Sequence, residues 1–145
     1  FERVINICEL LNAQELSREQ VTEEYAFDIR QTNYYTDAAR YLGLLEKHYE
    51  DGRKPIYSLS ASGKRIMNLN YKQRQLAFCE VILQHRAFKE TFNHCMKMGT
   101  MPDTSTIVAI MQESNLYKVE SMSTYVRRSS TISGWINWML GLIEE

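Results

Sequence analysis

Three features of the sequence predict a mainly α-helical fold with a small β wing, an α+β class. Apolar residues recur at intervals of three and four through most of the chain, as they do on the buried face of a helix. Two capping pairs, Ser17 with Gln20 and Asp28 with Gln31, mark helix starts. Between residues 44 and 59 the pattern becomes strand-like around an Asp-Gly pair, which is typical of a hairpin.

The first half of the chain is expected to hold three helices and then a hairpin. The two capping pairs begin the second and third helices, and Gly43 ends the third as a C-terminal cap. Residues 44–49 and 56–59 are the predicted hairpin strands. This is the order of a winged helix-turn-helix unit, which we assign to residues 1–69. The third helix is expected to turn five residues inward: Tyr34, Tyr35, Ala38, Ala39 and Leu42.

Residues 70–145 are expected to form a second helical unit. Its helical pattern is interrupted near His85, a further helix starts at Asp103 or Thr104, and Ser121 caps the last helix. Helix, turn and long helix repeat the motif of the first unit, with the wing absent or truncated. The predicted architecture is therefore two winged-helix/helix-turn-helix units in tandem.

A short internal repeat supports this duplication. Residues 41–46 read YLGLLE and residues 139–144 read MLGLIE, and the same offset places Arg128 opposite Arg30. Each copy is expected to close a helix at its glycine. We interpret the repeat as two copies of one recognition helix.

Composition places the chain among soluble globular proteins. Of its 145 residues 44% are hydrophobic and 24% charged, and no apolar run approaches the roughly 20 residues of a membrane span. Cys8, Cys79 and Cys95 are widely spaced at apolar helical positions, which predicts buried thiols without a disulfide in a reducing, cytoplasmic setting. Because the chain starts at Phe1 within a helical pattern, we expect it to be part of a longer protein.

Charge is unevenly distributed although the formal net charge is only −1. Residues 1–28 carry seven acidic side chains against two arginines, whereas residues 53–79 carry six basic side chains and no acid. Residues 121–143 carry two arginines and again no acid. Such asymmetry can produce a basic face on a near-neutral protein. The alternative is a solvated surface with chance clustering.

The candidate DNA contacts follow from how a helix-turn-helix binds. The first turns of its second helix enter the major groove, where Arg pairs with guanine and Gln or Asn with adenine. Lys54 and its neighbour at the wing tip, Arg53, are expected to contact flanking phosphates. Polar residues at the recognition positions are, in the first unit, Arg30, Gln31, Asn33 and Asp37, and in the second, Ser123, Thr124, Arg127, Arg128 and Thr131.

No catalytic residue, metal site or cofactor site is predicted. His94 and Cys95 are adjacent but lack a second ligand pair at zinc spacing. The six glycines form no phosphate-binding loop, and no Glu has Lys two residues later, as a metal-dependent nuclease would need.

Residues 27–46 (FDIRQTNYYTDAARYLGLLE) and 123–138 (STYVRRSSTISGWINW) resemble the tandem winged-helix region of bacterial and archaeal restriction-modification proteins, including type II restriction endonucleases. The resemblance spans nearly the whole chain. It implies a segment that reads double-stranded DNA by sequence while a separate, covalently linked nuclease domain cuts it. The chain departs from this pattern in lacking a nuclease element and a second wing.

The alternative function is a protein-protein interaction or dimerisation module of a transcriptional regulator. Trp135, Trp138 and Met139 would supply an aromatic docking patch on the last helix, for a partner or a second copy of the chain. The two tryptophans would otherwise stack on single-stranded bases or lie in the core, and their helical spacing favours the core.

Overall fold

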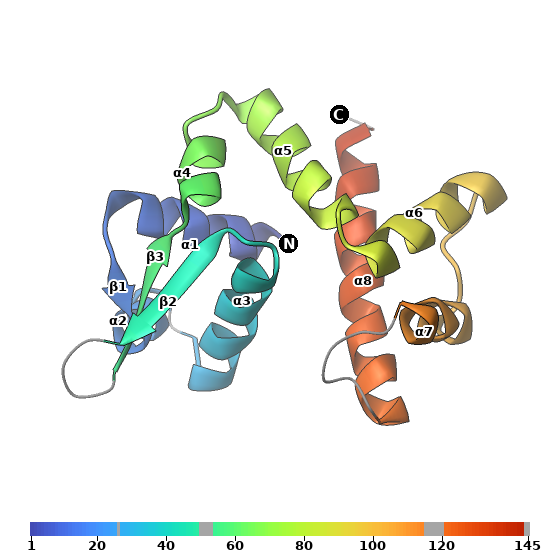
Figure 1. Cartoon of the computed structure of the whole chain (residues 1–145), viewed down its shortest axis with the longest axis horizontal. Helices are drawn as coiled ribbons and strands as arrows, with labels where there is room; N and C mark the ends of the chain where they lie inside the picture. Colours follow the sequence, from blue (N-terminus) through green and yellow to red (C-terminus); the bar gives the residue numbers. More distant parts are fainter. Residues whose placement is uncertain (26, 50–53, 115–120, 144–145) are drawn as a thin grey trace. The chain divides into compact units, whose positions relative to one another are not determined.

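The computed structural model describes residues 1–25, 27–49, 54–114 and 121–143 (Figure 1). These residues form eight helices and one small antiparallel sheet of three strands, which confirms the predicted mainly α-helical class with a small β component. The chain divides into two compact units, Phe1–Phe78 and Cys79–Glu145. The division lies within helix α5 (Tyr71–Leu83), whereas the sequence analysis placed it between residues 69 and 70.

Unit 1 contains three helices and then a two-stranded hairpin, in the predicted order, and a short helix follows the hairpin. The helices are α1 (Glu2–Ala13), α2 (Arg18–Glu24), α3 (Ile29–Tyr41) and α4 (Ala61–Met67), and the strands are β1 (Leu16–Ser17), β2 (Leu45–Tyr49) and β3 (Pro55–Leu59). The sheet has the order β1-β3-β2, so that β3 is central. Its register pairs Leu45 with Leu59 and Leu16 with Tyr57. The tip of the hairpin, with Arg53, lies outside the described residues.

Both predicted capping boxes are present and fix where α2 and α3 begin. Ser17 Oγ accepts the Gln20 N–H at 3.2 Å, and Gln20 Oε1 accepts the Ser17 N–H at 2.8 Å. Asp28 and Gln31 exchange the same two bonds at 2.9 and 3.0 Å. These bonds satisfy backbone donors that a helix start otherwise leaves unpaired.

The turn between α3 and β2 is fixed by glycine and by the start of α4. Gly43 has φ +75°, a left-handed conformation that glycine adopts without strain, and it ends α3 as predicted. The Ser60 hydroxyl donates to the Gly43 carbonyl at 2.7 Å and accepts the Gly63 N–H at 3.0 Å. One side chain therefore caps α4 and ties it to the end of α3.

The core-facing side of α3 differs from the predicted one. Its buried residues are Thr32, Thr36 and Ala39, while Tyr34 is 48% exposed and packs edge to face on Tyr35 with ring centroids 5.0 Å apart. The expectation that Tyr34 faces inward was wrong. The buried side consists of small residues where α3 packs against α1 and α2, and a tyrosine can keep an amphipathic ring at the surface.

Unit 2 is helical throughout its described residues. It contains the end of α5, then α6 (Arg86–Met98), α7 (Thr104–Glu113) and α8 (Met122–Ile143), and α6, α7 and α8 all pack against one another. Asp103 caps α7 by accepting the Thr106 N–H at 2.8 Å. In the core, Phe88 stacks on Trp135 with ring centroids 5.0 Å apart and an interplanar angle of 19°.

The two copies of the sequence repeat do not have the same structure. Gly43 ends α3, but α8 continues through Gly141 to Ile143, so the expectation that both glycines close a helix was wrong. Gly43 needs its positive φ because the chain must leave α3 and enter β2. Gly141 lies within α8, where an added Cβ would meet nothing within 4 Å.

The three cysteines are free thiols, with Cys8 and Cys95 buried and Cys79 half-buried. Burial, with a smaller contribution from Glu9, raises the pKa of the Cys8 thiol to about 12, so this thiol stays protonated at neutral pH. Across the described ranges, no helix combines the length and apolar character needed to cross a membrane.

Candidate nucleic-acid interface

The outer face of α3 is a continuous polar and aromatic stripe that begins at its first turn. Its members recur at helical spacing, so they lie on one side of the helix. We call this set the α3 stripe: Arg30, Asn33, Tyr34, Asp37, Arg40 and Tyr41. Asn33 is half-buried and the other five are exposed. Three of the four predicted α3 contact residues therefore share one accessible face.

The fourth, Gln31, is placed differently. Its side-chain carbonyl already accepts the Asp28 N–H, so only its amide nitrogen remains to donate to an external partner. Gln31 is therefore a helix cap first, and its predicted contact with adenine would need the capping bond to open. The sequence showed both roles, and the structure satisfies the capping role.

The carboxylate of Asp37 is paired on the helix surface. Its Oδ1 lies 3.4 Å from Arg40 Nη1, and the two side chains are 64% and 42% exposed. Exposed pairs of this kind are worth about 0–1 kcal/mol, so the pair can rearrange when a ligand arrives. Arg40 and Tyr41 were not among the predicted contacts, although a strict helical count from Arg30 would have included both.

The hairpin returns toward the same end of unit 1 as the first turn of α3. In Figure 1, α3 starts at the lower end of unit 1 and rises, and β2 then runs back down before β3 returns. The end of β2 and the start of β3 therefore lie toward the end of unit 1 where α3 begins, and the exposed Lys54 directly precedes β3. The topology brings the first turn of α3 and the far end of the hairpin strands to one end of the unit.

This end of unit 1 is electrically mixed and not uniformly basic. Glu15 lies 3.9 Å from His48 of β2, and Asp28 caps α3 beside Arg30. A surface with few excess positive charges gains little from non-specific phosphate attraction. Any preference for nucleic acid would therefore depend on directed contacts from the α3 stripe.

On α8 the predicted contacts divide into capping hydroxyls and exposed guanidinium groups. Ser121 Oγ accepts the Thr124 N–H at 3.2 Å and lies 2.7 Å from Thr124 Oγ1, so Thr124 belongs to the helix cap. Arg127 and Arg128 are exposed one turn later. Ser123 is exposed and Thr131 half-buried. The α8 arginines and Ser123 are thus accessible, whereas Thr124 is engaged in the cap and Thr131 is half-buried.

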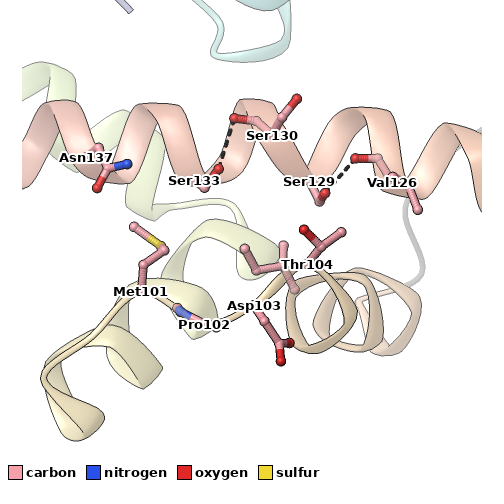
Figure 2. Close-up of a pocket in the computed structure, with 10 residues that line it drawn as sticks. Met101, Pro102, Asp103, Thr104, Val126, Ser129, Ser130, Ser133 and Asn137 are labelled. Carbon is pink, nitrogen blue, oxygen red and sulfur yellow. Dashed lines mark hydrogen bonds between the residues drawn. The ribbon is translucent and has the colours of Figure 1, made fainter.

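A pocket of about 550 Å³ lies beside the start of α7 and the middle of α8 (Figure 2). Ser129 of α8 faces Thr104 of α7 there, and its hydroxyl donates to the Val126 carbonyl at 2.6 Å. The backbone N–H of Thr106, aided by the Ser105 hydroxyl, lowers the pKa of Asp103. Figure 2 shows this carboxylate pointing away from α8, where it already accepts the Thr106 N–H, so the start of α7 offers little to a phosphate.

No cluster of three or more His, Cys, Asp or Glu side chains that could hold a metal ion occurs among the described residues. His94 and Cys95 are adjacent in α6, but they differ in exposure: Cys95 is buried and His94 is half-buried.

The described residues form two units, the first of which carries α3, with its exposed polar and aromatic face, beside the β2–β3 hairpin. The chain belongs to the family described as a domain of unknown function (DUF7226), whose model matches residues 3–144. Neither a curated protein nor a solved structure matches the chain.

Proposed function

We propose that this chain is a sequence-specific double-stranded DNA-binding module, with α3 as the recognition helix of a winged helix-turn-helix and the hairpin as its wing. The observation that carries the proposal is the α3 stripe, which opens at the same end of unit 1 as the hairpin. Polar side chains on the first turns of an exposed helix are what base reading in the major groove requires.

Three polar members of the stripe each have a matching base edge. Arg30 can donate two hydrogen bonds to guanine, Asn33 can pair with adenine, and Asp37 can accept from the amino group of cytosine. A carboxylate near DNA is repelled by phosphates, and Arg40 at 3.4 Å offsets that charge. Tyr34 adds an exposed ring able to contact a thymine methyl group.

Unit 2 adds phosphate contacts in this proposal. Arg127 and Arg128 are exposed near the start of α8, in a segment without acids, and guanidinium groups bind phosphate oxygens in a bidentate manner.

The resemblance to restriction-modification proteins supports a further step. We infer that the chain is the recognition part of a restriction endonuclease in a prokaryotic cytoplasm, joined to a nuclease domain. The free cysteine thiols fit that reducing compartment.

The alternative, a docking or dimerisation surface on α8, loses most of its motivating residues. Trp135 and Met139 are buried, at 6% and 4% exposure, and Trp138 is half-buried. Burial of Trp135 against Phe88 also removes it as a stacking platform for single strands. Protein contact on α8 therefore stays a prediction that rests on Trp138 alone of the three.

Two alanine variants should separate base reading from phosphate anchoring. We expect Asn33→Ala to lower affinity for the preferred duplex by about 1 to 3 kcal/mol and to relax the preference at one position, since a bidentate base contact is lost. We expect Lys54→Ala to weaken all duplexes alike and to reduce the salt slope by about one. The measurement is fluorescence titration at several salt concentrations, after selection of the preferred site from a randomised duplex library.

Two results would contradict the proposal. Absence of duplex binding by the wild-type chain at low salt would remove DNA as the partner. If Asn33→Ala instead weakened every duplex equally, α3 would be an anchor, and specificity would have to come from α8 or from residues outside this chain.

A further inference from the structure

We propose that Thr32 is a positioning residue that holds the recognition face of α3 in place through a directed hydroxyl bond to α2. This inference rests on the proposed function and names how the α3 stripe is oriented. Thr32 Oγ1 lies 2.7 Å from Thr22 Oγ1, and Thr32 is fully buried. The two residues belong to the two helices of the helix-turn-helix, so this bond crosses between them.

The direction of the bond follows from the neighbouring contacts. The Thr22 hydroxyl donates its only proton to the Arg18 carbonyl at 2.7 Å, because a carbonyl oxygen cannot donate. Thr32 must therefore be the donor to Thr22. On the α3 side, the Thr36 hydroxyl donates to the Thr32 carbonyl at 2.7 Å. The result is a directed relay of two hydroxyl bonds, from Thr32 of α3 to Thr22 of α2 and on to the Arg18 carbonyl, whereas the Thr36 bond stays within α3.

This bond carries weight because the buried residues within α3 are all small, although Tyr35 packs half-buried beside Phe27 and Leu42 is buried just after the helix. The buried residues of α3 are Thr32, Thr36 and Ala39. Apolar contact is non-directional, so small side chains alone leave rotation of the helix about its own axis weakly defined. A hydroxyl bond has a preferred distance and angle, and it fixes that rotation. Asn33, the next residue, and Arg30 then keep a defined direction on the outer face.

Base reading is sensitive to such orientation. A recognition group works only when it is held within about 0.5 Å and 10–20° of its productive geometry. Thr32→Val keeps the volume and branching of the side chain but removes the donor, so α3 should retain its fold and lose its fixed rotation. Phosphate contacts tolerate this better than base contacts, since they carry no sequence information.

Thr36→Val is the matched control, because Thr36 is equally buried but its hydroxyl bonds only within α3. We expect Thr32→Val to lose about tenfold in affinity for the preferred duplex, as for one disturbed base contact, while affinity for a scrambled duplex and the salt slope stay unchanged. Thr36→Val should keep the wild-type ratio of the two affinities. Thr32→Ser, which restores the donor, should return to within about twofold of wild type. Should Thr32→Val fail to fold, Thr22→Val breaks the same link from α2.

The outcomes are distinguishable. If the wild-type chain binds no duplex, the proposed function fails and this role of Thr32 fails with it. If the wild-type chain discriminates between duplexes and Thr32→Val keeps the same affinity ratio as Thr36→Val, only the positioning role is overturned. Equal losses on preferred and scrambled duplexes would likewise overturn it, by showing a general structural effect.

Discussion

Gly63→Ala is expected to destabilise unit 1 by about 2 to 3 kcal/mol, the upper part of the range for overpacked cores. An added Cβ at Gly63 would overlap the carbonyl oxygen of Leu44 and lie 3.1 Å from Leu59 Cδ2. The Leu44 carbonyl also accepts the Ser60 N–H at 2.9 Å, so it cannot move without breaking the contact that holds α4. The gain in helix propensity from alanine, about 1 kcal/mol, is too small to compensate.

The matched control is Gly134→Ala. Gly134 also lies inside a helix, but an added Cβ there has nothing within 4 Å. This variant should therefore be neutral or more stable by about 0.5–1 kcal/mol, because alanine loses less backbone entropy on folding. Urea unfolding followed by far-UV circular dichroism measures both, and hydrogen exchange can localise the loss to unit 1. Equal stability of the two variants would show that α4 does not pack closely on the α3–β2 turn.

Local signals in the sequence predicted the helix starts well. The capping boxes at Ser17 and Asp28 are contacts over three residues, so the sequence carries them in full. Gly43 was similarly readable, since a left-handed residue after a helix has few alternatives to glycine. The two-residue strand β1 was missed, because it exists only through pairing with β3 about forty residues later.

The side of α3 that faces the core was harder to predict. Hydrophobicity placed Tyr34 inside, yet the core side of α3 is made of threonine and alanine. The sequence could not show that Thr22 and Thr32 meet, because they are ten residues apart on two helices whose crossing is a tertiary feature. The same limit explains Gly141: its local sequence matches that of Gly43, but the described residues after Gly141 continue α8 to Ile143 and do not enter a strand.

The sequence predicted which residues belong to the candidate site, but not which side chains they contact. Arg30, Asn33 and Asp37 were recognised by residue type and by position near a helix start. The sequence did not show that their face is the exposed one, or that Arg40 pairs with Asp37 on it, because the outward side of α3 depends on how the helix packs. A side chain that serves as a cap, such as Gln31, cannot be separated from one that reads bases until its hydrogen bonds are known.

Trp135→Ala is expected to have the largest effect in unit 2, a loss of about 3 to 5 kcal/mol. Trp135 is 6% exposed and stacks on Phe88 of α6, so its removal leaves a large cavity between α6 and α8. Arg127 and Arg128 lie two turns earlier on α8, and they would lose the packing that holds their helix. DNA affinity should therefore fall on preferred and scrambled duplexes alike, in contrast to the selective effect expected for Asn33→Ala.

Trp138→Ala is the matched control, since Trp138 lies on the same helix but is only half-buried. It should cost clearly less stability than Trp135→Ala, because the cost rises with the buried surface and with the cavity left behind. Urea unfolding of both variants and sedimentation of the folded chains give the comparison. If Trp138→Ala were the more damaging change, or if it converted an oligomer into a monomer, then α8 would be a protein-docking surface. The arginines at its start would then serve that contact and not DNA.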